Sequence, residues 1–358
     1  MKKYNDTNFI TGIRAIAVLM VFLVHSGGGI LRDISPYVSG LVDSGMYGVQ
    51  IFFVISGFTI FYQIYKSGYN YQQFLIIRLL RISIPYYPVL IIMFSLYYMG
   101  YIEPGGWAEL YNNGTYSLYN LFMHLSYLGG FSGKYQNTIL MVEWTLYVEV
   151  FYYLVIGGIV CHSIKTKTKP NYILLFVLSF AMYVAIKYVA KNDVIDPNVA
   201  NWYPFKYMIM FLVGGMAYKI RYSIKTNSIL SDASLLLILV TILLSPIIGT
   251  TLTEILMCLS VMLSIIFIKN GTFASRLLNS RIIQFYGVIS YSFYLWHMPV
   301  FNILRKFGIN GAEFIIYSFA ITTMVSTASY VFLEKGVYSK LKNMATNKDN
   351  NFSENYNR

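Results

Sequence analysis

Charged side chains are scarce in this sequence. Only 12% of its 358 residues are Asp, Glu, Lys or Arg, whereas 56% are hydrophobic. A soluble globular domain carries about 25% charged residues, because these side chains cover its surface. The shortage excludes an ordinary soluble domain and predicts a surface that faces lipid.

Cysteine is also rare, and its placement excludes two further classes. Cys161 and Cys258 lie in or beside apolar runs without paired spacing, so we expect neither a disulfide framework nor a metal site. The net charge of +12 comes from Lys and Arg clusters between apolar runs. That pattern is typical of cytoplasmic loops and not of a nucleic-acid-binding surface.

Long apolar runs are abundant, and a spanning helix needs about 20 such residues. They predict an all-α polytopic membrane protein with about ten transmembrane helices, in which residues 1–340 form the transmembrane domain. Residues 341–358 are polar, and we expect them to form a disordered cytoplasmic tail. The ten runs are 9–28, 45–65, 82–101, 141–161, 171–190, 203–220, 230–249, 254–268, 282–302 and 313–334.

The segment 116–131 decides the topology. It is short, contains Asn120 and His124 and ends in glycines, so we interpret it as an interfacial or re-entrant part of an outer loop. With ten spans and both termini in the cytoplasm, most of the 27 Lys and Arg residues then fall on the inner side. Counting this segment as a span would invert every later loop.

Three apolar runs carry ionisable side chains in their interior, where charge is costly and indicates function. The first contains Arg14 and His25, eleven residues or about 16 Å apart along a helix and on one face of it. The fourth places Glu149 near the midplane or slightly outward. The ninth places His297 toward the outer end. We predict that His25 and Glu149 are catalytic and that His297 binds substrate.

Arg78 and Arg81 lie three residues apart at the cytoplasmic start of the third run. Together with Arg14 they can form an inner cationic cluster that binds the phosphates of an anionic cofactor. Further out, neutral His25 can take a proton from a sugar hydroxyl, with Glu149 orienting the ring. The sequence thus indicates two chemistries at two depths.

Each of these residues also has a simpler interpretation. The arginines can be topology determinants at the inner interface, and a buried His or Glu can be a polar contact between packed helices. His297 can be an interfacial residue beside Trp296. We expect His124 and Glu143 to be outer-loop residues without chemistry.

Aromatic side chains are plentiful, and most of the 34 tyrosines fit interface belts and helix contacts. Tyrosines near His25, Glu149 and His297, in the outer half of the membrane, can also stack on sugar rings. For this role we predict Trp144 and Tyr147.

Five motifs resemble those of the membrane-bound acyltransferase 3 family and occur in its order. TGIRAIAVLMVFLVH contains the Arg and His of its opening motif, here Arg14 and His25. RLLRISIPYY resembles its paired-arginine segment, and EWTLYVEVFYY its Trp-Ser-Leu…Glu motif, with Thr145 in place of Ser. GVQIFFVISGF resembles its second-helix signature and SYSFYLWHMPV its penultimate-helix motif.

The resemblance implies ten spanning helices and acyl transfer, usually of acetyl from cytoplasmic acetyl-CoA, to a carbohydrate at the outer side. It implies that His25 is the essential catalytic residue, Arg14 its partner and Glu149 a second essential group. Arg78 and Arg81 match the paired arginines. We therefore expect an O-acetyltransferase of a surface polysaccharide such as O-antigen, in the bacterial cytoplasmic (inner) membrane.

The acceptor is expected to be a lipid-linked carbohydrate, in contact with membrane lipid and without an obligate protein partner. Two alternatives remain open: the same fold transferring succinyl or another acyl group, and a glycan transporter or flippase. The sequence does not decide whether His25 acts as a base or carries the acyl group itself.

Overall fold

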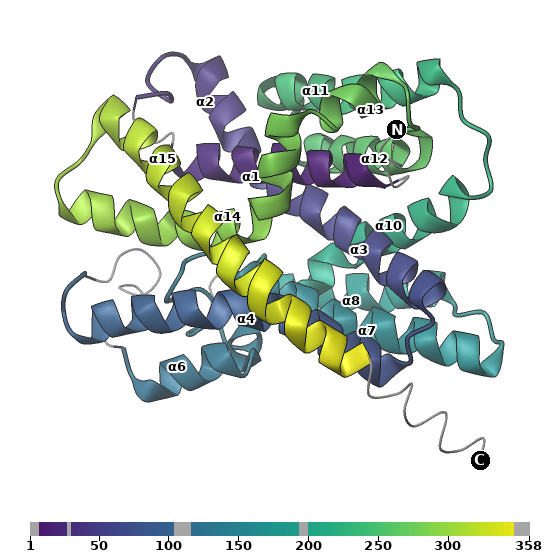
Figure 1. The fold of residues 1–358 in the computed structure, drawn as a ribbon, viewed down its shortest axis with the longest axis horizontal. Coiled ribbons are helices and arrows are strands. Elements are labelled where there is room, and N and C mark those ends of the chain that lie inside the picture. Colours follow the sequence, from purple (N-terminus) through teal and green to yellow (C-terminus); the bar gives the residue numbers. More distant parts are fainter. Residues whose placement is uncertain (1–6, 27–29, 104–115, 193–199, 347–358) are drawn as a thin grey trace. The chain divides into compact units, whose positions relative to one another are not determined.

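The computed structural model describes residues 7–26, 30–103, 116–192 and 200–346, and every regular element within these ranges is helical (Figure 1). Each of the ten predicted apolar runs overlaps one helix of at least 14 residues. These helices are α1 (Asn8–Ser26), α3 (Tyr47–Ser67), α4 (Tyr71–Tyr98), α7 (Trp144–Thr166), α8 (Tyr172–Lys191), α10 (Met208–Arg221), α11 (Ser228–Ile248), α12 (Thr250–Phe267), α14 (Arg281–Lys306) and α15 (Gly311–Ser329). The all-α prediction is confirmed.

Eight stretches of helix within the described residues are long and apolar enough to cross a membrane. Of the ten helices above, α10 and α14 do not meet that measure. α10 has only 14 residues. α14 has 26 residues but buries the polar side chains of Ser290, Ser292 and His297. The chain is a multi-pass membrane protein, and the count of ten spans remains a prediction.

The helices form two compact units. Unit 1 comprises Met1–Thr59 and Ile209–Thr323, and unit 2 comprises Ile60–Met208 and Met324–Arg358. Short elements complete them: α2 (Pro36–Asp43), η1 (Ser44–Met46) and α13 (Phe273–Leu278) in unit 1, and α6 (Leu118–Leu125), η2 (Leu128–Phe131), η3 (Pro204–Tyr207) and η4 (Tyr330–Tyr338) in unit 2.

In unit 1, α1 and α14 (Figure 1, purple and green) pack against one another, and their contacts follow the same order along both helices. Thr11 of α1 meets Gly287 of α14, and further along both helices His25 meets His297. Parallel helices cross a membrane in the same direction. This agrees with the expected topology, in which the first and the ninth span both run outward.

In unit 2, α4 and α7 run antiparallel. Phe74, early in α4, lies against Gly157 in the second half of α7. Tyr86, later in α4, interacts with Tyr147 near the beginning of α7. Within the described residues of the segment between them, 99–103 and 116–143, the helical elements are α6 and η2. Eight residues of α6 rise about 12 Å, too little to span a bilayer. Leaving 116–131 out of the spans therefore agrees with the direction of the two helices.

Two predicted boundaries are wrong. The third helix begins at Tyr71 and not near residue 82, because Asn70 and Gln73 form a capping box that starts it. Residues 341–346 were expected to belong to a disordered tail, but they continue the last helix. That helix passes through a π-helical stretch, Tyr330–Tyr338. The rest of the tail lies outside the described residues, as do both termini.

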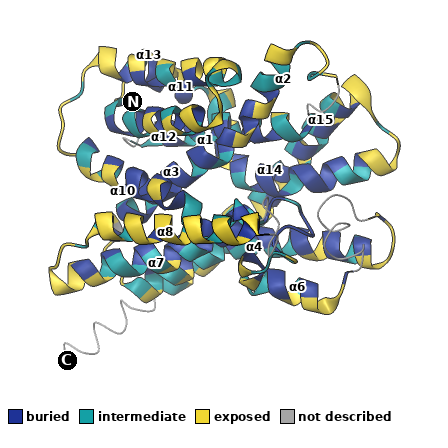
Figure 2. Ribbon diagram, turned by 180° about the vertical axis from the view of Figure 1, so that it is seen from behind, coloured by how far each residue is buried: buried dark blue, intermediate teal, exposed yellow. Residues whose placement is uncertain are grey.

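Burial differs sharply between helices (Figure 2). α8 is largely exposed, with 11% of its apolar window buried, whereas the corresponding window of α1 is 61% buried. The exposed side chains of α8 are apolar, among them Ile173, Leu178 and Phe180. Lipid is the solvent that such a surface requires.

Candidate active site

The imidazole rings of His25 and His297 meet where α1 and α14 lie together. Nδ1 of His25 is 2.9 Å from Nε2 of His297, and the ring planes are inclined by 26° with centroids 5.0 Å apart. His297 is 1% exposed, and its Nδ1 is 2.5 Å from the carbonyl oxygen of Tyr294. Unit 1 therefore contains a hydrogen-bonded histidine pair that joins two motifs far apart in the sequence.

Close packing of the two helices holds this pair together. A Cβ atom at Gly287 would lie 2.0 Å from the carbonyl oxygen of Thr11, so the helices approach as closely as two backbones allow. Nearer the histidines, Phe22 of α1 contacts the rings of Phe293 and Phe301 of α14, with centroids 5.6 and 5.3 Å apart. Backbone contact at one end and aromatic packing at the other fix both histidine backbones.

Two arginines of unit 1 lie close enough to His25 to interact with it electrostatically. Arg32 and Arg305 both interact electrostatically with His25. Arg32 is itself paired with Asp43 at 2.7 Å, and the guanidinium of Arg305 lies 5.2 Å from the ring of Phe314. Within the described part of the chain, no ion pair joins either histidine to a carboxylate.

Arg14 lies on α1, half-buried and eleven residues before His25. The uninterrupted helix between them gives the expected rise of about 16 Å. Arg14 belongs to unit 1, whereas Arg78 and Arg81 belong to unit 2. The predicted cluster of three arginines therefore stays a prediction.

Arg78 is buried in unit 2 between two aromatic rings. It is 2% exposed, and its guanidinium lies 5.7 Å from the ring of Phe74 and 5.1 Å from that of Tyr153. Its Nε and Nη2 atoms have no hydrogen-bond partner among the described residues. Because a buried guanidinium with unsatisfied donors is costly, these atoms are suited to an anionic ligand.

Glu149 is one of the electrostatic partners of this arginine pair. It lies about one and a half turns inside α7 and interacts with both Arg78 and Arg81. The expectation that Glu149 lies at a different depth from the arginines is therefore wrong. The cause is the early start of α4, which places Arg78 and Arg81 two to three turns inside the helix. The ring partner of His25 in the structure is His297.

The last helix adds two groups to the arginine pair that the sequence did not indicate. Arg81 interacts electrostatically with Glu334 and Tyr338, both in the π-helical stretch η4, which packs against α4. π-helical turns occur frequently at functional sites. The available signal for Glu334 was an acidic residue at the very end of the last apolar run, 313–334.

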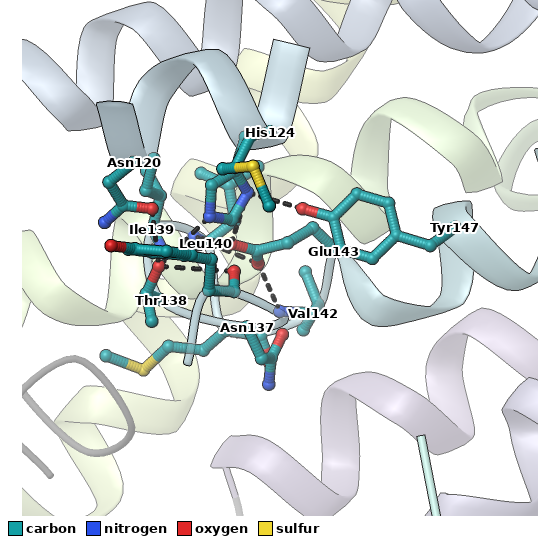
Figure 3. A network of polar contacts seen from close by, with 12 residues as sticks. Asn120, His124, Asn137, Thr138, Ile139, Leu140, Val142, Glu143 and Tyr147 are labelled. Carbon is teal, nitrogen blue, oxygen red and sulfur yellow. Dashed lines mark hydrogen bonds and ion pairs between the residues drawn. The ribbon is translucent and has the colours of Figure 1, made fainter. Parts of the chain in front are cut away.

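A second polar network lies in unit 2, where the loop before α7 folds against α6 (Figure 3). The His124 ring is fully buried, with Nδ1 2.6 Å from the Tyr147 hydroxyl and Nε2 3.0 Å from Thr138 Oγ1. Thr138 donates to Asn120 Oδ1, so its oxygen accepts from Nε2–H of His124. Burial lowers the pKa of His124 to about 3, and the ring is neutral at pH 7.

Glu143 is the acidic centre of this network. Its carboxylate accepts hydrogen bonds from the backbone N–H groups of Ile139, Leu140 and Val142, and Oε1 lies 3.3 Å from Nδ1 of His124. Burial raises the pKa of Glu143, and the backbone hydrogen bonds oppose that rise. The carboxylate thus organises the turn that leads into α7.

His124 and Glu143, which we expected to be outer-loop residues without chemistry, are both 0% exposed, and the sequence analysis did not foresee this burial. A signal was available. Asn120 and His124 are four residues apart in an apolar segment, so they share one face of a helix. Both side chains bond Thr138, which fixes the loop to α6.

The two aromatic residues predicted to bind sugar have different surroundings. Tyr147 is 4% exposed and its hydroxyl is bonded to His124. Trp144 is half-buried and stacks on Trp202 at 6.5 Å, with Tyr207 at 5.6 Å. Only the Trp144 cluster is partly accessible, and sugar binding by either residue stays a prediction.

Comparison with known proteins agrees with the motifs. A family model described as an acyltransferase domain, that of acyltransferase 3, matches residues 7–334. The match begins just before α1 and ends at Glu334, so it includes the histidine pair and the arginine pair. No curated protein and no solved structure matches the chain.

Proposed function

The chain belongs to the acyltransferase 3 family and is a multi-pass membrane protein that transfers acyl groups other than aminoacyl groups. We propose that it acetylates a cell-surface polysaccharide. The donor is acetyl-CoA, and the acceptor is a hydroxyl of a lipid-linked glycan such as an O-antigen unit. The location is the inner membrane of a bacterium.

The observation that carries this proposal is the histidine pair. A half-buried imidazole at His25, hydrogen-bonded to a second ring, is suited to accept a proton from a hydroxyl. The family resemblance assigns the catalytic role to this residue. The two described histidines outside the pair are placed differently, since His124 is bonded on both nitrogens and His162 is exposed.

The arginine pair supports the choice of donor. Coenzyme A carries phosphates, and Arg78 has two buried nitrogen atoms, Nε and Nη2, without a described hydrogen-bond partner. Arg81 adds a second cation one turn away, and Glu149 limits the net charge of the site. We assign Arg78 and Arg81 to the phosphates of the donor.

The reaction balances without a metal or redox group. His25 takes the proton of the sugar hydroxyl, the oxygen attacks the thioester carbonyl, the C–S bond breaks, and the proton passes to the leaving thiolate. In the second route, the free nitrogen of His25 attacks the thioester carbonyl, the C–S bond breaks and the thiolate leaves. The sugar oxygen then attacks the acetylated ring, the C–N bond breaks, and the hydroxyl proton passes to the thiolate. Both routes use one nitrogen of His25.

Mass spectrometry of the surface glycan tests the proposal. Cells that lack the protein should lose one acetyl mass from the glycan, complementation with the natural protein should restore it, and His25→Ala should not. His162→Ala is the matched control, because His162 is exposed on α7.

Each result has one interpretation. A succinyl or other acyl mass in place of acetyl would correct the donor. Loss of surface glycan with unchanged acylation would point to transport. Full acylation by His25→Ala, at normal membrane abundance, would refute the catalytic role.

A further inference from the structure

We propose that His297 is a positioning residue that fixes the tautomer of His25 and thereby makes Nε2 of His25 the reactive nitrogen. This inference rests on the proposed function and deepens it. It follows from a chain of two hydrogen bonds, the first between the Tyr294 carbonyl and His297, the second between His297 and His25.

The order begins at a group that can only accept. The carbonyl oxygen of Tyr294 has no hydrogen to give, so Nδ1 of His297, at 2.5 Å, must carry one. A neutral imidazole holds a single N–H. Nε2 of neutral His297 is therefore bare and acts as an acceptor.

The second step transfers this constraint to His25. Since Nε2 of His297 accepts, Nδ1 of His25, at 2.9 Å, must be the donor. A hydrogen bond between the His25 ring and the backbone of Val21, one turn earlier in α1, fits the same assignment, because Nδ1 is the ring nitrogen nearer the main chain. Nε2 of His25 then holds the free lone pair.

The opposite arrangement needs an additional proton. If Nδ1 of His25 were the acceptor, His297 would have to carry hydrogens on both nitrogens and become an imidazolium. His297 is 1% exposed, and within the described residues no carboxylate forms an ion pair with it. A buried charge without a counter-ion is strongly disfavoured, so the neutral arrangement is the one that the geometry supports.

His297 thus takes the place that a carboxylate occupies in a catalytic triad. It differs in being neutral, so it orients the His25 ring through its acceptor nitrogen without cancelling charge. The packing of Phe301 edge-on against the His297 ring, with centroids 5.5 Å apart, holds the ring in this orientation.

Nitrogen-15 NMR of the whole protein in detergent or nanodiscs, labelled at histidine, tests the tautomer directly. The chain has four histidines, so single variants assign their signals. In the natural protein we expect His25 as the Nδ1–H tautomer. In His297→Leu we expect a larger share of the Nε2–H tautomer, because one of the two acceptors of Nδ1–H is gone and only the backbone of Val21 remains.

Kinetics supplies the second measurement, with acetyl-CoA and polysaccharide from cells that lack the protein as substrates. His297→Leu should lower kcat by about 100-fold with little change in KM for acetyl-CoA. His297→Gln retains an acceptor near the position of Nε2 and should lose about tenfold or less. His297→Asn is one methylene shorter and should behave like His297→Leu, which keeps the test valid if the Leu variant does not reach the membrane.

Two results would overturn the inference: an Nε2–H tautomer of His25 in the natural protein, or equal activity of His297→Gln and His297→Asn. The tautomer is measured without substrate, so it separates this inference from the proposed function. An Nδ1–H signal from a protein that acylates no glycan would contradict the proposed function and leave the ring pairing intact.

Discussion

The hydroxyl of Tyr147 donates to Nδ1 of His124 across 2.6 Å, in a site where neither the ring nor its carboxylate neighbour Glu143 reaches solvent. Tyr147 is in the first turns of α7 and His124 is in α6. This hydrogen bond therefore connects α6 to the spanning helix α7. The protonation state of His124 controls whether the bond can form.

Acid should weaken the loop through His124. Because burial lowers its pKa to about 3 from 6.5, the unfolded chain binds the proton more readily. The contribution is complete above pH 6.5 and is lost as pH falls toward 3, by up to about 1.4 kcal/mol per pH unit. Thermal unfolding of the natural protein and His124→Gln between pH 7.5 and 4 checks this. Glu143 is present in both proteins, so its contribution largely cancels, and parallel curves would contradict the prediction.

Glu143→Gln should destabilise the loop by about 2 kcal/mol or more, because the amide offers one acceptor to three backbone N–H groups and turns its own N–H toward them. The measurement is a lower Tm together with faster proteolysis between α6 and α7. Glu103→Gln is a suitable control, since Glu103 is exposed. An unchanged Tm for Glu143→Gln would show that the carboxylate is not the centre of the turn.

Gly287→Ala should separate α1 from α14, because the new methyl group would lie 2.0 Å from the carbonyl oxygen of Thr11. We expect at least a tenfold loss of acylation and a lower Tm. Gly158→Ala is the matched control, since a Cβ there meets Tyr71 at an ordinary 3.4 Å. Similar behaviour of the two variants would show that the close helix contact is not required.

Arg78→Lys should raise KM for acetyl-CoA about tenfold while kcat changes little, because Lys keeps the charge but loses the forked donor arrangement. Calorimetric titration with coenzyme A should show the same loss of affinity. Arg276→Lys, at an exposed position of α13, serves as the control. If Arg78→Lys binds coenzyme A normally, the phosphates bind elsewhere.

The sequence was sufficient for properties that depend on local composition. Apolar runs predicted the long helices, and the family motif drew attention to His25 and His297 separately. Their pairing could not be predicted, because it depends on Gly287 meeting Thr11, a contact between segments 276 residues apart in the chain. The proximity of Glu149 to Arg78 and Arg81 was missed for a local reason: the capping box at Asn70 was not recognised, so the arginines were placed too near a helix end.

The burial of His124 and Glu143 was missed for another reason. Hydropathy averages a segment and does not show which polar atoms of a loop will bond one another. The turn around Ile139 and Leu140 places three N–H groups around one carboxylate, and only coordinates display such an arrangement.

The contact of Gly287 with the backbone of Thr11 has a mechanical consequence. A bilayer that is thinner or thicker than the hydrophobic length of a helix makes the helix tilt. The main chains of α1 and α14 touch at one end, and Phe22 packs against the rings of Phe293 and Phe301 at the other. We therefore expect the two helices to tilt together. The 2.9 Å distance between Nδ1 of His25 and Nε2 of His297 should then stay the same in membranes of different lipid composition.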